Sequence, residues 1–138
     1  MKIPPKNEGS LMSRTDFTDD SAWESICESI SQPVDEFAAI VDCLSDRQYD
    51  RLTVEQLTAL IPEGFDHTFA FIVDQMTFAH PEQSVLVVDL SENRGDTFRV
   101  VPSAMWAVEN NLSIGNMDFR EFAQMADEDG ILRGIPGF

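Results

Sequence analysis

Apolar residues recur along the chain with two different periods, and these periods predict its helices and strands. In one stretch they fall three and four residues apart, on one face of a helix, at Trp23, Ile26, Cys27 and Ile30. Ser21 and Glu24, at the start of this stretch, have the spacing of a capping box. We therefore predict a helix over about residues 22–31.

Runs of strand length account for most of the other apolar residues. They lie at residues 11–17, 37–44, 67–73, 85–90 and 97–101. The second run is almost continuously apolar, which is typical of a strand buried on both faces. After it, Thr53 and Gln56 form another capping box and open a helix that ends near Pro62. Strands that alternate with helices in this way are typical of parallel crossover units.

The pattern changes after Gly64, because no helix fits between the last three apolar runs. We expect these strands to form an antiparallel meander. Pro102 cannot donate a ladder hydrogen bond and ends the last strand. Ser103 then caps a short helix that reaches about Asn111, and a capping box at residues 118–121 opens a last helix.

The predicted fold is α/β, with a mixed five-stranded sheet and the element order β-α-β-α-β-β-β-α-α. The first strands are parallel, the last strands form the antiparallel meander, and the helices pack on the sheet. Residues 1–9 hold two prolines, a glycine and both lysines, so we expect a flexible lead-in there. Residues 10–138 should form a single globular domain, because 138 residues of which 43% are hydrophobic can bury a core.

The net charge of the chain limits the classes of molecule that it can bind. It has 25 acidic and 9 basic residues, a formal net charge of -16 that repels nucleic acids and anionic membranes. No apolar run approaches the roughly 20 residues of a membrane span. The two cysteines lack a C-x-x-C spacing, which favours a reducing compartment. We expect a soluble cytoplasmic protein that binds neither nucleic acid nor membranes and whose acidic surface suits a basic protein partner.

Three aspartates, Asp16, Asp19 and Asp20, lie between the first predicted strand and the first helix. Ligands commonly bind at this end of a parallel sheet. Arg14 precedes them inside the strand pattern, where a charge is costly unless it is paired. We favour aspartates that cap the helix and stabilise its positive end over a metal site, and keep all four residues as binding candidates.

Catalytic and cofactor motifs are missing from the sequence. His67 and His80 stand in no nucleophile motif, and together with Cys27 and Cys43 they lack the paired spacing of a zinc site. There is no glycine-rich phosphate loop. We therefore predict no catalytic residue, metal or cofactor, and favour a binding module over an enzyme.

A dense group of polar residues follows Pro102. Trp106, Glu109 and Asn110 share one face of the predicted helix, and Asn111 and Asn116 come after them. An aromatic ring beside a carboxylate and an amide suits a recognition surface. Alternatively, the ring packs under the sheet and the amides satisfy open helix ends. The two interpretations differ in whether these side chains point into the fold or line a cleft.

Three segments resemble those of a family of small acidic bacterial domains of unknown function: RTDFTDDSAW, VLVVDL and FRVVPSAMWAVENNLSIGNMDFREFA. The resemblance covers nearly all of the chain from about residue 11, and it implies recurring motifs without an activity. We predict a non-enzymatic regulatory module that binds a protein partner, with immunity- or antitoxin-like action as one form. One alternative is a small-ligand binder or acid-dependent enzyme that joins the acidic turn to the Trp106 helix. A nucleic-acid mimic is the weaker alternative.

Overall fold

The computed structural model describes residues 10–32, 39, 41–61, 68–91, 93–113, 115 and 117–134. Its strands are β1 (Ser10–Arg14), β2 (Val41–Leu44), β3 (Phe69–Val73), β4 (Val85–Asp89), β5 (Thr97–Val100) and β6 (Ile131–Leu132). Its α-helices are α1 (Asp20–Ile30), α2 (Val54–Leu60), α3 (Gln75–Ala79), α4 (Met105–Ser113) and α5 (Phe119–Met125). Two short 3-10 helices are η1 (Arg47–Tyr49) and η2 (Pro102–Ala104). None of these helices is long and apolar enough to span a membrane.

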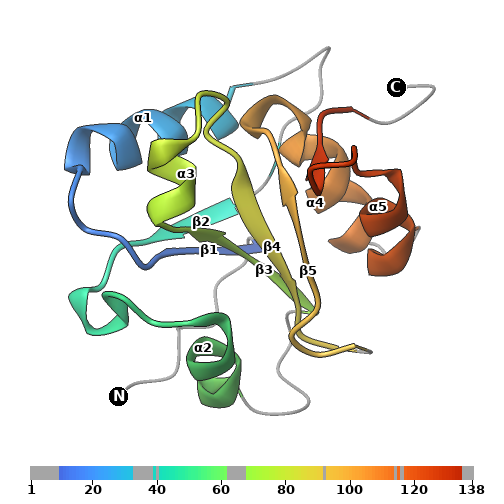
Figure 1. Cartoon of the computed structure of the whole chain (residues 1–138), viewed down its shortest axis with the longest axis horizontal. Helices are drawn as coiled ribbons and strands as arrows, with labels where there is room; N and C mark the ends of the chain where they lie inside the picture. The colour runs from blue at the N-terminus through green and yellow to red at the C-terminus, as the bar shows by residue number, and fades with distance from the viewer. Residues whose placement is uncertain are drawn as a thin grey trace.

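The strands form one mixed sheet in the order β2-β1-β3-β4-β5-β6 (Figure 1). β1 runs parallel to both β2 and β3, while β3, β4 and β5 form an antiparallel meander. The predicted α/β fold, parallel at its start and antiparallel later, is confirmed.

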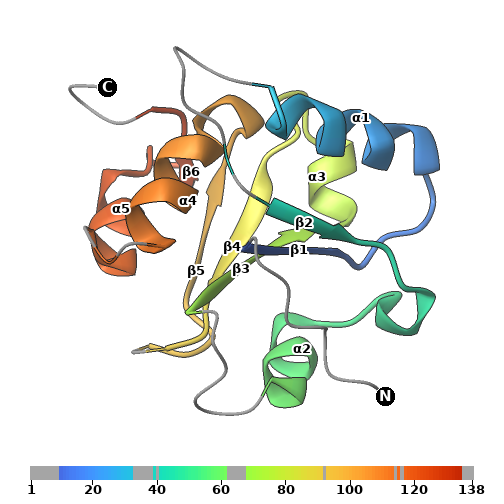
Figure 2. The same ribbon diagram turned by 180° about the vertical axis from the view of Figure 1, so that it is seen from behind.

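Helices cover both faces of the sheet, with α1 and α2 on opposite sides (Figures 1 and 2). On one face, Met12 of β1 belongs to a core with Ile26 of α1 and Phe122 of α5. On the other face, Leu11 belongs to a core with Leu57 of α2. The neighbours Leu11 and Met12 serve different cores because successive side chains of a strand alternate between its faces.

β2 is an edge strand, so the prediction that it is buried on both faces is wrong. Its residues are half-buried or exposed, and residues 37, 38 and 40 of the predicted run lie outside the described residues. The crossover through α2 places β3 beyond β1, which leaves β2 with a single neighbour. Val41 packs against one core and Leu44 against the other, which accounts for the apolar character of an edge strand.

Two short elements are additions to the predicted order. α3 occupies five residues of a connection for which we expected no helix, and β6 gives the described part of the chain six strands instead of five. One turn of helix is too short to show a helical period, and two residues are too short to show a strand period. The Asp74-x-x-Thr77 spacing was the available signal for α3, because Asp74 Oδ1 accepts from the backbone N–H of Thr77 at 3.1 Å.

The start of α1 differs from the prediction in the residue that caps it. Asp19 is the cap, and its carboxylate accepts from the N–H of the third helical residue at 2.9 Å. Ser21 lies inside the helix, so the predicted box there is wrong. The box at Thr53 is confirmed, and Glu121 accepts from the N–H of Asp118 at 3.1 Å as the last box predicts.

Arg133 ties the end of β6 to neighbouring loops through three carboxylates. Its guanidinium lies 2.7 Å from Glu82, 2.8 Å from Asp127 and 2.7 Å from Asp129. Hydrogen bonds from Arg133 hold the pKa of the Glu82 and Asp129 carboxyls below the ordinary value. Because these groups are exposed, salt screens their attraction.

Candidate functional site

A cleft of about 910 Å³ opens at the carboxyl ends of β1 and β3. The crossover from β1 to β2 passes through α1 on one face of the sheet, and the crossover from β2 to β3 passes through α2 on the other (Figures 1 and 2). Such a switch of direction leaves a crevice at the strand ends, where open α/β sheets commonly bind ligands. The cleft is lined by residues 15–18 after β1, residues 47 and 50–52 before α2, residues 74–76 and 79 of the α3 region, and Arg99 of β5.

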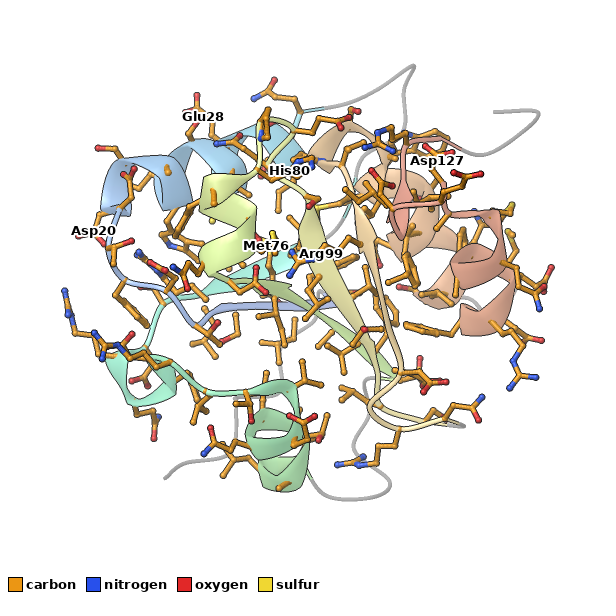
Figure 3. All side chains as sticks on the ribbon, in the orientation of Figure 1. Asp20, Glu28, Met76, His80, Arg99 and Asp127 are labelled. Carbon is orange, nitrogen blue, oxygen red and sulfur yellow. The ribbon has the colours of Figure 1, made fainter. Side chains whose placement is uncertain are left out.

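One side of the cleft holds a bidentate ion pair between Asp74 and Arg99. Arg99 Nη2 lies 2.6 Å from Asp74 Oδ2, and Nη1 lies 3.1 Å from Oδ1. Arg99 also donates to the carbonyl of Ser84, while Asp74 caps α3. The two side chains are 18% and 25% exposed, so the pair is accessible from the cleft, next to the exposed Met76 (Figure 3). This pair offsets the cost of a charge inside a strand, as we expected for Arg14.

Two further arginines, Arg47 and Arg51, line the cleft and are exposed. Among the described residues neither forms an ion pair. Arg47 lies over the ring of Phe17, 5.4 Å from its centroid. Arg51 has a φ of 62°, in the left-handed region, and its N–H donates to the carbonyl of Thr15 at 2.7 Å. A non-glycine residue in this region is uncommon and is enriched at functional sites.

Arg14 ends β1 behind the cleft and is 2% exposed. Its Nη1 lies 2.9 Å from Asp20 Oδ1, and its Nε donates to the carbonyl of Asp16 at 3.0 Å. The guanidinium stacks 4.4 Å from the ring centroid of Phe17 and 5.2 Å from that of Trp23. Its Nη2 is buried and has no hydrogen-bond partner in the described part of the chain.

The three aspartates after β1 have separate local roles. Asp16 accepts from the N–H of Thr18 at 2.8 Å, Asp19 caps α1, and Asp20 pairs with Arg14. Asp16 also lines the cleft, whereas the other two do not. The described residues contain no group of three or more acidic, histidine or cysteine side chains placed to hold a metal. The capping interpretation that we favoured is confirmed for Asp19, because its carboxylate caps α1.

The polar helix α4 points its central carboxylate into the fold. Glu109 is buried, and it accepts hydrogen bonds from Ser10 Oγ at 2.9 Å and from Ser113 Oγ. Asn110 donates to Glu109 at 3.4 Å, and buried Asn111 donates to the carbonyl of the residue one turn earlier at 2.8 Å.

The other polar and aromatic residues predicted for this stretch are Trp106, Ser103 and Asn116. Trp106 packs at the edge of the core that α1 also covers. Ser103 lies within η2 and does not cap α4. Asn116 lies outside the described residues.

The acidic turn and the α4 motif lie at opposite ends of β1. Glu109 contacts Ser10, the first residue of β1, while Asp16 follows the last. Five strand residues span roughly 13 Å at 3.3 Å per residue. No residue of 106–111 lines the cleft, so the structure does not bring together the two groups that the shared-site alternative requires.

Comparison with known proteins agrees with the motifs. The model of a family described as "Domain of unknown function (DUF6924)" matches residues 9–135. The chain belongs to this family. The match spans both the cleft and α4, and the resemblance of the three motif segments is confirmed. No curated protein matches the chain.

In this DUF6924 domain, the sequence pattern points to the strand end where the cleft lies, but it does not mark two of the cationic residues that line the cleft. Arg47 and Arg51 sit in a short polar segment between β2 and α2, and nothing periodic marks them. The available signal was the count of charges: basic residues are scarce here, and these two fall within five positions of each other.

Proposed function

We propose that this protein is a non-enzymatic binding module whose cleft holds an anionic group of its ligand, a carboxylate or a phosphate. One observation carries the proposal. In a chain with 25 acidic and 9 basic residues, Arg47 and Arg51 face the cleft and form no ion pair with any described residue. Guanidinium groups in such an acidic chain have many potential internal partners, so two that form no ion pair within the described part of the chain favour an external partner.

The chemistry of arginine fits this ligand class. Its planar guanidinium donates two parallel hydrogen bonds to one carboxylate or phosphate. Arg99, already oriented by Asp74, adds a third guanidinium to the lining of the cleft. The overall charge of the chain repels anions at long range, so the ligand must gain its affinity from these contacts at close range.

Binding is favoured over catalysis by the residues that line the cleft. Those of them that the structure describes include no histidine and no cysteine, the side chains that most readily gain or lose protons near neutral pH. A reducing location such as the cytoplasm is part of the proposal, because Cys27 and Cys43 are both free thiols.

The test is a titration of the ¹⁵N-labelled protein with inorganic phosphate and with succinate, each at constant ionic strength. We expect amide shifts to cluster at residues 15–18, 50–52 and 74–76. The anion that binds with the higher affinity identifies the ligand class. The Arg47→Gln/Arg51→Gln double variant should lose these shifts. Arg120→Gln is the matched control, because Arg120 is also an exposed arginine but lies on α5, outside the cleft.

Two results would overturn the proposal. In the first, shifts are spread over the surface without a cluster at the cleft, as expected from non-specific screening. In the second, the double variant retains the wild-type response while its spectrum shows that it is folded.

A basic protein partner is the second candidate, and the exposed face of α1 favours it. Asp20, Glu24 and Glu28 lie one turn apart and are all exposed, with Asp20 and Glu28 on the outer side of the helix (Figure 3). A lysine-rich peptide should bind more weakly to Glu24→Gln/Glu28→Gln than to the control Glu55→Gln on α2. Equal affinity for both variants would exclude α1 as the docking face.

A further inference from the structure

The only two cysteines of the chain, Cys27 of α1 and Cys43 of β2, lie on one face of the sheet. In the parallel register of β1 and β2, Cys43 is the partner of Met12, and paired residues on adjacent strands project to the same face. Met12 belongs to the core on the α1 side, and Cys27 of α1 packs against that same core. Each thiol is the main cause of the pKa shift of the other, so the helix and the edge strand bring the two sulfurs close together.

The two thiols differ in exposure and acidity. Cys43 is exposed on the edge strand, whereas Cys27 is half-buried. The hydrogen bond from Cys27 lowers the pKa of Cys43, against opposing effects of burial and of Asp42. The same bond raises the pKa of Cys27, and burial raises it further. The more accessible sulfur is therefore also the better source of thiolate, which is the nucleophile in disulfide exchange.

We propose that Cys27 and Cys43 form a redox-active pair that a small disulfide oxidant of the glutathione class converts to an intramolecular disulfide between α1 and β2. This site goes beyond the proposed anion cleft and does not depend on it. Its two partners come from different elements, so the disulfide fixes the helix to the edge of the sheet.

The reaction has two exchange steps. The Cys43 thiolate attacks one sulfur of the oxidant, forms a mixed disulfide and expels one thiolate. Cys27 then loses its proton to solvent and attacks Cys43 Sγ, so that the protein disulfide forms and the second thiolate leaves. The two protein thiols lose two electrons and two protons in total, and the oxidant becomes two thiols.

The test compares folded and denatured protein in glutathione buffers of graded ratio. Samples are quenched by alkylation, and the Cys27–Cys43 link is measured by intact mass and peptide mapping. If the fold holds the thiols together, the link should form in the folded chain at a buffer ratio at least about tenfold more reducing than in urea. Formation at the same ratio or a more oxidising one, or stable glutathione adducts without a link, would overturn the proposal.

Single variants test which sulfur reacts first. Cys27→Ser keeps the exposed thiol and should form its glutathione adduct faster than Cys43→Ser, which keeps the half-buried one. The reverse order would overturn the assignment of Cys43 as the attacking group. If either variant does not fold, the rate at which each thiol of the reduced wild type is alkylated, resolved by peptide mapping, makes the same comparison.

Discussion

Breaking the Asp74–Arg99 pair should reduce the stability of the protein by an amount that a double-mutant cycle can isolate. Exposed ion pairs contribute up to about 1 kcal/mol, while removing one partner of a fully buried pair costs about 3–5 kcal/mol. This pair is bidentate, and the side chains of Arg99 and Asp74 are 18% and 25% exposed. Its contribution to the free energy of unfolding should therefore lie between these limits. We expect a coupling free energy of about 2 kcal/mol between the two side chains.

The cycle uses Asp74→Asn and Arg99→Gln, singly and together, with urea unfolding as the assay. Asparagine is chosen because it retains the capping of α3, whereas alanine would add a capping loss of about 1 kcal/mol. Each single variant should be destabilised, and the double variant should lose less than the sum of the two. A coupling free energy below about 0.5 kcal/mol would refute the reasoning, because the pair would then behave as an exposed one.

The same variants also test whether Arg99 binds an anion in the cleft. In Asp74→Asn, Arg99 keeps its charge but loses its carboxylate partner, so this variant should bind inorganic phosphate more tightly than the wild type. Arg99→Gln should bind it more weakly. If both variants weaken binding equally, Arg99 acts through the structure of the cleft and does not contact the anion.

Four other perturbations have defined outcomes. Glu109→Ala should lower the free energy of unfolding in urea by about 2 kcal/mol, because it leaves the buried hydroxyl of Ser10 without its carboxylate acceptor. Asp19→Ala should cost about 1 kcal/mol in the same assay, whereas Ser21→Ala should change it little, since only the first residue caps α1. Glu82 and Asp129, two carboxyls that bind Arg133, have lowered pKa values, so they stabilise the fold above their unfolded pKa; thermal melts should show this stability lost as pH falls through the folded pKa, with a weaker pH dependence in Arg133→Gln. Arg51→Gly should weaken phosphate binding without destabilising the fold.

The sheet could be predicted because its strands are long enough to carry a pattern. Runs of five to eight residues in the sequence identified β1 to β5, and the presence or absence of long helices between them fixed which pairs are parallel. The short helix α3 and the strand β6 gave no such pattern. Both elements depend on tertiary partners that no local window of sequence contains. Arg99 binds Asp74, which caps α3, and β5 pairs with β6.

The candidate site was predicted only in part, for a related reason. Arg14 and the aspartates after β1 lie at the predicted strand end, but of these four residues only Asp16 lines the cleft. The polar residues of α4 suggested a surface, yet Glu109 is satisfied by Ser10, which is 99 positions away in the sequence. A buried carboxylate and an exposed one have the same sequence pattern, and only the fold distinguishes them.

Variants of Arg51 can separate ligand binding in the cleft from the stability of the fold. A left-handed conformation costs a non-glycine residue about 1 kcal/mol, and glycine removes this cost while adding a similar amount of chain entropy to the unfolded state. Arg51→Gly should therefore be about as stable as the wild type, and Arg51→Ala should keep the strain. Both variants lack the guanidinium, so both should lose affinity for phosphate to the same extent. A large destabilisation by glycine would mean that the side chain supports the fold, whereas equal stability with weaker binding would mean that the arginine is held at a conformational cost for its charge.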